Sequence, residues 1–177
     1  MKTKISCLLI SIIILFSTVS CEDTSYIPDY AKPVWDDGDM VVFHNSSNDD
    51  CDSLVLNKDY RWETSNNYNE EYCLLDYNNP LADTSRFTVK IQIEKALIYD
   101  NSVDIPEYLY YFDEFESYNQ AGYVYDDVYK LGFDTIQEYY GTVYHHNPEI
   151  RELWYSLKYG IIRYKTKDGE DFKLKRN

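Results

Sequence analysis

Three aspartates within residues 48–52 are the first candidates for chemistry, because they could offer oxygen ligands to a cation. Carboxylate and amide oxygens are the ligands that Ca²⁺ prefers in proteins. A calcium loop of the EF-hand type, however, needs glycine at its sixth position and a bidentate glutamate at its twelfth. Counted from Asn48, those positions hold Ser53 and Asp59. We therefore interpret the segment as a solvated loop and predict no metal site in it.

Two adjacent histidines and five carboxylates are the other candidates for catalysis or metal binding. His145 and His146 would point to opposite faces of a strand, so they could share a metal only within a loop. A glycoside hydrolase needs two carboxylates a few ångströms apart, but among 31 acidic residues such neighbours arise by chance. Nucleophile motifs such as Gly-x-Ser-x-Gly are absent from the sequence, so we predict neither an enzyme nor a cofactor. The five carboxylates are Asp113, Glu114, Glu116, Asp126 and Asp127.

Aromatic residues alternate along two segments and form a candidate binding strip. Tyr108, Tyr110 and Phe112 would share one face of a strand, and Tyr123 and Tyr125 would share a face of the next strand. If it is exposed, such a strip could stack on sugar rings or hold a peptide, because exposed apolar patches mark interaction sites. Ordinary core and cross-strand packing explains the same alternation. We favour packing, and the solvent-facing side of the sheet decides between the two.

The N-terminus has the organisation of a secretory signal. Lys2 and Lys4 precede a mostly apolar run over residues 5–19, and small residues stand at its end. This run of about fifteen residues is shorter than the roughly twenty that a transmembrane helix needs. We therefore predict that residues 1–20 form a signal peptide, which is removed.

The end of this segment resembles the bacterial lipobox, in which a cysteine that follows small residues is lipidated on sulfur and becomes the mature N-terminus. Here Thr18, Val19 and Ser20 precede Cys21, with Thr18 where the motif prefers Leu, Val or Ile. The resemblance implies that Cys21 is lipidated. Several acyl chains would then give stable attachment, since one chain binds a membrane only marginally. Cleavage nearby, with Cys21 in a disulfide, is the alternative.

Two cysteines, Cys51 and Cys73, remain once Cys7 leaves with the signal and Cys21 is lipidated. In an oxidising compartment an isolated pair is typical of a disulfide. Closing this loop would stabilise the fold by roughly 3 kcal/mol in the chain-entropy model. We predict a Cys51–Cys73 disulfide, with two free thiols as the alternative.

Alternating residues predict β-strands along much of the chain. Over residues 86–94, apolar Phe87, Val89, Ile91 and Ile93 alternate with polar residues. A period of two with one apolar face is typical of antiparallel sheets. The chain is therefore predicted to be mainly β, as an antiparallel sandwich or a curved, partly open barrel.

Other segments complete the predicted organisation. Asp168-Gly169 lies between alternating segments and predicts a hairpin in which both turn residues take positive φ. At most one or two short helices are expected, one of them over residues 131–140. Residues 21–38 lack periodicity and are predicted to be the lipidated N-terminus and an extended tether. A single β-rich domain follows over residues 39–177.

The charge of the chain excludes two kinds of partner. Loss of Lys2 and Lys4 leaves 15 basic residues against 31 acidic ones, a mature net charge near −16. Nucleic-acid phosphates and anionic lipid head groups would both repel such a domain. We therefore expect no nucleic-acid partner, and attachment to a membrane must come from lipid. The protein is expected to be a monomer.

Residues 125–129 and 154–164, with Asp168-Gly169, are similar to motifs of small uncharacterised outer-membrane lipoproteins of the Bacteroidota. The motifs are Tyr-x-x-Val-Tyr, Tyr-Ser-x-x-Tyr-Gly-Ile and a final Asp-Gly hairpin. This resemblance covers roughly the last third of the chain and the signal region, implies an all-β lipoprotein fold, and carries no known activity. The acidic residues after Cys21 resemble a signal for display on the cell surface.

Together these features predict a lipid-anchored outer-membrane lipoprotein with a non-enzymatic binding or structural role toward a glycan or a protein partner. A carboxylate-based hydrolase of cell-envelope or dietary glycans is the first alternative, and two close carboxylates in a deep pocket would favour it. A lipid-carrier-like half-barrel is the second, and an apolar cavity open to solvent would favour that.

Overall fold

The computed structural model describes residues 23–65, 68–81, 85–100, 107–110, 114–133, 136–139, 142–145 and 149–176. They form one 3-10 turn, η1 (Asp29–Ala31), and the strands β1 (Asp23–Ser25), β2 (Met40–Asn45), β3 (Cys51–Ser65), β4 (Tyr68–Asn78), β5 (Ser85–Ile91), β6 (Lys95–Asp100) and β7 (Glu107–Tyr110). The later strands are β8 (Glu116–Gln120), β9 (Tyr123–Gly132), β10 (Ile136–Tyr139), β11 (Thr142–His145), β12 (Ile150–Ser156), β13 (Gly160–Thr166) and β14 (Asp171–Leu174). Within these ranges no helix has the length and apolar character needed to cross a bilayer.

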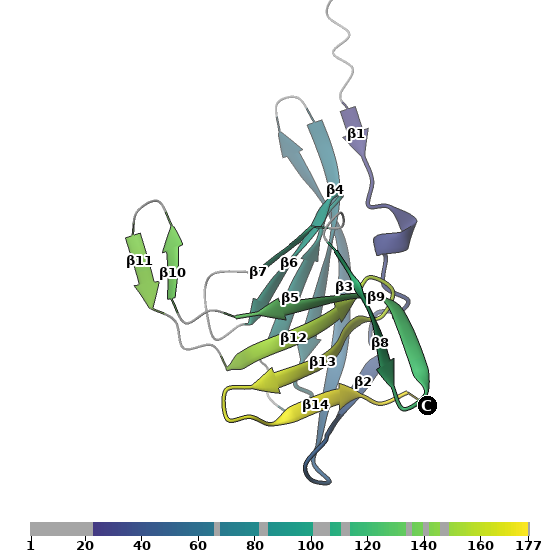
Figure 1. The fold of residues 1–177 in the computed structure, drawn as a ribbon. Helices are drawn as coiled ribbons and strands as arrows, with labels where there is room; N and C mark the ends of the chain where they lie inside the picture. The colour runs from purple at the N-terminus through teal and green to yellow at the C-terminus, as the bar shows by residue number, and fades with distance from the viewer. Residues whose placement is uncertain are drawn as a thin grey trace, which may run out of the picture.

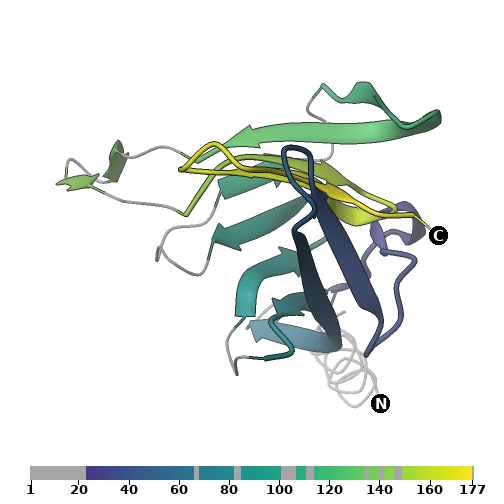
Figure 2. The ribbon, with the colours of Figure 1, turned by 90° about the horizontal axis from the view of Figure 1, so that it is seen from below.

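Most strands belong to one curled antiparallel sheet. Its order is β7-β6-β5-β4-β3-β2-β14-β13-β12-β9-β8, and the short β1 pairs in parallel with β4 beside this path. The sheet curls far enough for β7 to contact β9, although the two strands are not paired (Figures 1 and 2). The predicted mainly β fold, a curved and partly open antiparallel sheet with at most one or two short helices, is confirmed.

The alternating segment 86–94 forms a strand as far as its pattern of burial lasts. Phe87, Val89 and Ile91 are buried in β5, and the residues between them are partly exposed. The strand ends at Ile91, and the backbone N–H of Gln92 donates to the carbonyl of Lys95 (2.8 Å) in the turn to β6. The alternating pattern therefore predicted the strand correctly, but the predicted strand ran three residues past its observed end.

The C-terminal hairpin forms where Asp168-Gly169 predicted it, between β13 and β14. Its turn is nevertheless longer than the predicted two-residue turn. Gly169 takes a φ of 89°, whereas Asp168 does not have positive φ. The backbone N–H of Thr166 donates to the carbonyl of Glu170 (3.0 Å) and closes the loop. Only the glycine needs the left-handed conformation in this arrangement, as in hairpins with three or more loop residues.

The helix predicted between Leu131 and Tyr140 does not form in the residues of that segment that the structure describes, 131–133 and 136–139. β9 continues to Gly132, and β10 pairs with β11 in a separate two-stranded antiparallel sheet. Ile136, Tyr139 and Val143 are residues that suit a pleated strand better than a helix. These residues therefore form paired strands rather than a helix.

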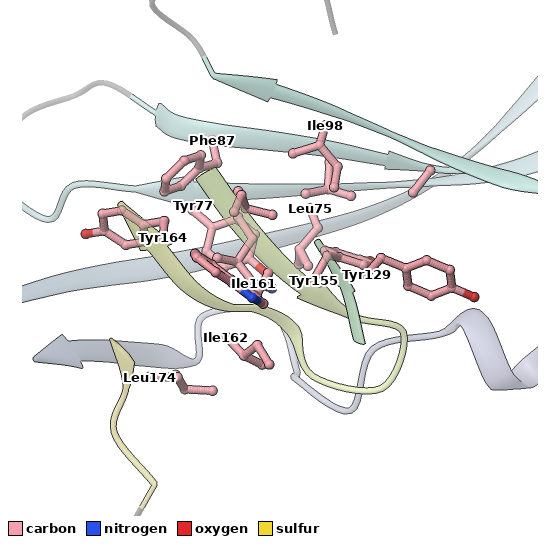
Figure 3. Packing of buried hydrophobic residues seen from close by; sticks show 14 of the residues in the cluster. Leu75, Tyr77, Phe87, Ile98, Tyr129, Tyr155, Ile161, Ile162, Tyr164 and Leu174 are labelled. Carbon is pink, nitrogen blue, oxygen red and sulfur yellow. The ribbon is translucent and has the colours of Figure 1, made fainter. Parts of the chain in front are cut away.

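Buried side chains fill the space between β4–β6 and β12–β13 (Figure 3). Tyr77 lies fully buried at the centre, and its hydroxyl accepts a hydrogen bond from the backbone N–H of Ile161 (3.0 Å). Gly160 beside it has a φ of 66°, and a Cβ there would lie 2.2 Å from the Tyr77 hydroxyl oxygen. Position 160 must therefore be glycine, both for its backbone conformation and for the approach of Tyr77.

A second buried group of rings lies beside Tyr77. Tyr164 stacks on Phe172 at 5.0 Å between ring centroids and contacts Phe43 and Phe87 edge-on, at 5.2 Å each. Its hydroxyl donates to Asp52, which also pairs with Arg86. Burial, followed by the Asp52 charge, raises the pKa of Tyr164 above its ordinary value. The phenol therefore stays protonated and serves as a buried donor.

The prediction of an extended tether over residues 21–38 is wrong for the part that the structure describes. Ile27 and Ala31 are buried in the main core, only 2% and 1% exposed. The indole N–H of Trp35 donates to the carbonyl of Tyr159 (2.7 Å). These apolar residues are spaced too irregularly to show a helix or strand pattern in the sequence. They are nevertheless buried, because they cover an open end of the curved sheet. This segment therefore belongs to the folded domain, while Cys21 lies outside the described residues.

The predicted Cys51–Cys73 disulfide is also wrong, because both thiols are free. Cys51 begins β3 opposite His44, whereas Cys73 lies opposite Tyr60, nine residues farther along the same strand. At about 3.3 Å per residue the two sites are about 30 Å apart, while a disulfide needs Cα atoms within about 7 Å. Spacing in the sequence could not reveal the pairing register that separates them.

We predict that Gly160→Ala destabilises the fold by about 2–4 kcal/mol, because a left-handed alanine and a clash in the core add together. Gly169→Ala is the matched control: its φ is also positive, but a Cβ there meets nothing within 4 Å. Urea unfolding monitored by circular dichroism measures both losses.

A second variant isolates the clash with the hydroxyl. Without that oxygen, the nearest Tyr77 atom to an alanine Cβ at position 160 lies 3.6 Å away. Tyr77→Phe should therefore restore part of the stability that Gly160→Ala loses. Equal losses for Gly160→Ala and Gly169→Ala, with no such recovery, would contradict the proposed role of Tyr77.

We predict that the domain from residue 22 onward has one rapidly reactive thiol. Cys51 is exposed, while Cys73 is buried and its pKa is raised to about 11, mainly by burial. Maleimide labelling without reductant should modify Cys51 in the folded protein and Cys73 after denaturation. Cys51→Ser should remove the rapid reaction. A protein with no reactive thiol even when denatured would mean that a disulfide forms after all.

Candidate functional site

A groove of about 510 Å³ lies between the β8–β9 hairpin and the C-terminal residues that follow β14. The hairpin lies beside the C-terminus in both views of the fold (Figures 1 and 2). The side-chain amide of Gln120 donates to the backbone carbonyl of Leu174 (2.7 Å) and joins the two walls. This volume lies within the usual range of small-molecule sites, about 300–1,000 Å³.

The hairpin owes its tight end to two residues with positive φ. Ala121 and Gly122 have φ values of 52° and 84°, as a two-residue turn between paired Gln120 and Tyr123 requires. The side-chain oxygen of Asn119 accepts a hydrogen bond from the N–H of Gly122 (3.2 Å). The sequence supplies glycine at only one of the two positions, so Ala121 is held in an unfavourable conformation. Backbone strain of this kind tends to gather near functional sites.

Tyr123 and Arg176 line the groove and form a cluster with Tyr159, which lies behind them outside the lining. Arg176 lies 3.5 Å from the ring centroid of Tyr123 and 4.5 Å from that of Tyr159. The hydroxyls of Tyr123 and Tyr159 share a hydrogen bond of 2.8 Å. This hydrogen bond, together with nearby Arg176, lowers the pKa of Tyr159. The cluster holds Arg176 in place against the rings through cation–π attraction.

Among the described residues, two buried polar atoms at the groove lack a well-formed hydrogen bond, although Arg176 lies close to one of them. They are the hydroxyl of Tyr125, a residue only 2% exposed, and the side-chain oxygen of Gln120. Burial raises the pKa of Tyr125, against the opposing effect of the Arg176 charge. An unpaired buried polar group costs about 1–3 kcal/mol, and native proteins contain few of them. A bound molecule could remove this free-energy cost by donating a hydrogen bond to the side-chain oxygen of Gln120 and pairing with the hydroxyl of Tyr125.

The charge of the groove is opposite to that of the chain. Lys173, Lys175 and Arg176 line it, and none of its described lining residues is acidic. The whole chain has a net charge of −14. A cationic hollow on such a protein selects anionic ligands, because the remaining surface repels them.

A row of basic and aromatic residues continues from the groove across the sheet, and its basic groups pair with Glu152 and Asp171. Lys130, Trp154, Arg163, Lys173 and His44 are successive register partners on β9, β12, β13, β14 and β2, so they share one face. Trp154 is only 7% exposed because Arg163 lies 4.1 Å from its ring centroid and Lys130 5.2 Å from it. Sequence reasoning missed this row, which only strand pairing assembles.

A signal for this region was nevertheless present in the sequence. Residues 151–176 contain eight basic and four acidic residues, whereas the chain as a whole has 17 basic and 31 acidic residues. Such a local reversal of charge indicates a functional surface on one part of an otherwise acidic domain.

The predicted aromatic strip is only partly assembled. Tyr123 and Tyr125 are in contact, with ring centroids 4.8 Å apart, but Tyr123 is 38% exposed and Tyr125 is buried. Tyr125 is therefore packed as the favoured interpretation expects, and only Tyr123 of this pair presents an exposed ring. Tyr108 and Tyr110 lie on β7, which pairs with β6, and their side chains are outside the description. Phe112 lies outside the described residues.

Two of the carboxylates considered for hydrolysis, Asp126 and Asp127, are arranged differently from a catalytic pair. Asp126 accepts a hydrogen bond from Ser117 (3.3 Å), whereas Asp127 accepts from Ser156 (2.8 Å) and from the backbone N–H of Lys158 (2.9 Å). Adjacent strand residues face opposite sides, so these two carboxylates do not converge. Asp127 instead holds the turn between β12 and β13.

The remaining candidates have similarly local roles or lie outside the description. Asp50 accepts a hydrogen bond from the side chain of Asn48 (2.8 Å). His145 ends β11 and its side chain is not described, while Asp113 and His146 lie outside the described residues. No group of three potential metal ligands occurs among the residues with described positions.

Comparison of the chain with models of protein families, with curated proteins and with solved structures returned no match in any of the three. The case for the groove therefore depends on its own geometry and charge.

Proposed function

We propose that this protein is a lipid-anchored outer-membrane lipoprotein that binds an acidic saccharide in the groove beneath the β8–β9 hairpin. The observation that carries the proposal is the coincidence of three features in one hollow. These are a clustered guanidinium group, aromatic rings, and buried polar atoms that lack a well-formed hydrogen bond.

Each feature matches one part of a sugar acid. Arg176, Lys175 and Lys173 are suited to a carboxylate, because charge-assisted hydrogen bonds are stronger than neutral ones. The rings of Tyr123 and Tyr118 offer apolar surface to a pyranose face. Sugar hydroxyls both donate and accept, so they can satisfy the Gln120 oxygen and the Tyr125 hydroxyl.

The groove also lies at the end of the domain opposite its N-terminal entry. His44 of the groove pairs with Cys51 at the start of β3, whereas Asp23 pairs with Tyr68, which lies opposite Ser65 at the far end of β3. Fourteen residue steps along β3 span about 46 Å at about 3.3 Å each. A lipid on Cys21 would therefore leave the groove pointing away from the membrane and open to ligands.

We predict that the domain from residue 22 onward binds oligogalacturonides but not the matched neutral galacto-oligosaccharides in calorimetric titration. Arg176→Gln should weaken binding about tenfold, which corresponds to about 1.4 kcal/mol. Added salt should weaken it as well, since partly exposed charges are screened. Lys167→Gln is the control with the same charge change, because Lys167 pairs with Glu149 away from the groove.

Tyr125→Phe tests the unpaired hydroxyl with two measurements that should move in opposite directions. Removal of an unpaired buried hydroxyl should leave the free energy of unfolding unchanged or raise it by up to about 1 kcal/mol. Ligand affinity should fall, because one polar contact is lost. Equal affinity of all three variants, or no binding to any acidic glycan on an array, would contradict the proposed ligand class.

The anchor has its own test. Mass spectrometry of protein purified from a Gram-negative host should show cleavage before Cys21 and a lipidated N-terminal residue, and Cys21→Ala should remain unprocessed. An unmodified Cys21 thiol, or a freely secreted protein, would contradict the anchor without affecting the groove.

A further inference from the structure

A second surface lies at the far end of β3 and carries exposed rings. Tyr26, Trp62 and Tyr68 are 63%, 48% and 42% exposed, and we call these three residues the aromatic tip. The rings of Tyr26 and Trp62 meet edge-on at 5.3 Å between centroids. Tyr60, two residues before Trp62 on the same face of β3, is 43% exposed and extends the apolar surface. Large rings left this open to water at one end of a fold mark a contact surface.

The path of the chain places this tip next to the N-terminal cysteine. β1 starts at Asp23, directly opposite Tyr68 of β4. Figure 1 shows β1 and the ends of β3 and β4 at the end of the molecule opposite the C-terminus. Two residues span at most about 7 Å. A lipid on Cys21 therefore cannot lie far from Tyr68, whatever conformation the intervening residues adopt.

The chemistry of the tip suits the surface of a bilayer rather than its interior or its charges. Tyr and Trp combine an apolar ring with a polar group, and they concentrate at membrane–water interfaces. Glu63, next to Trp62 on β3, and Glu70 are register partners, and although Lys90 pairs with Glu63, an anionic surface would repel Glu70. The contact must therefore come from the rings, and it should be strongest on a zwitterionic surface.

We propose that the aromatic tip inserts into the head-group region of the membrane that holds the anchor. This inference rests on the proposed lipidation of Cys21. The anchor and the tip together then fix the orientation of the domain, because one attachment permits free rotation whereas two restrict it. The ligand groove is held away from the bilayer by the length of β3.

Tryptophan fluorescence can test this contact. The lipidated protein is reconstituted in phosphatidylcholine vesicles, with and without bromine on the acyl chains near the head group. Trp62 should be quenched by the brominated lipid and shifted to the blue, whereas Trp154 is shielded by Arg163 and Trp35 is partly buried with its indole N–H bonded to the Tyr159 carbonyl. We predict that Trp62→Phe removes the quenching and that Trp154→Phe keeps it. Replacing about a third of the lipid by phosphatidylglycerol should reduce the quenching, since like charges repel.

The outcomes separate the tip from the anchor. Protein that carries lipid and floats with the vesicles, yet shows no quenching of Trp62, overturns the inference and leaves the anchor intact. Protein with an unmodified Cys21 that does not float overturns both. Dimerisation of the unlipidated domain that Trp62→Ser abolishes would assign the tip to a second copy of the chain, and would likewise overturn the inference.

Discussion

The fold depends on a buried tyrosine hydroxyl that joins two distant parts of the chain. Tyr77 of β4 accepts the backbone N–H of Ile161 in β13, across 84 residues of sequence. A buried phenol of this size fits only because Gly160 has no side chain. The contact packs the C-terminal strands onto the N-terminal half of the sheet. The β8–β9 hairpin and the residues after β14, which enclose the groove, lie on those C-terminal strands.

The cationic groove and the exposed aromatic rings lie at opposite ends of the long strand β3. At the Cys51 end of β3, a cationic groove has formed on a chain with a net charge of −14. At the Ser65 end, exposed rings lie beside the entry of the chain. In the proposed function, the acidic body repels anionic surfaces while the groove attracts anionic ligands. Trp62 lies eleven residue steps along β3 from Cys51, about 36 Å at about 3.3 Å each, so the two surfaces are well separated.

The candidate site was hidden from sequence reasoning because pairing register, not spacing, assembles it. Tyr123 and Tyr125 follow the same alternation, yet one is 38% exposed and the other is buried. Tyr125 is the one enclosed by other rings, since Tyr118, Tyr123 and Tyr159 lie 6.3, 4.8 and 5.5 Å from it between ring centroids. The two free cysteines show the same limit: they were predicted to be bonded as an isolated pair, but nine steps along β3 separate their positions in the sheet.

The sequence by itself determined the local structure, that is, individual strands and turns. Alternation predicted β5 and a mainly β domain, and Asp-Gly predicted the hairpin of β13 and β14, because side-chain direction and turn conformation depend on adjacent residues. Only the tertiary structure determined that residues 24–38 pack on the core and that both thiols are free. It also assembled the row of basic residues across the sheet and the groove. Each of these depends on which strands pair and how the sheet curls, and those choices are settled by the packing of the whole core.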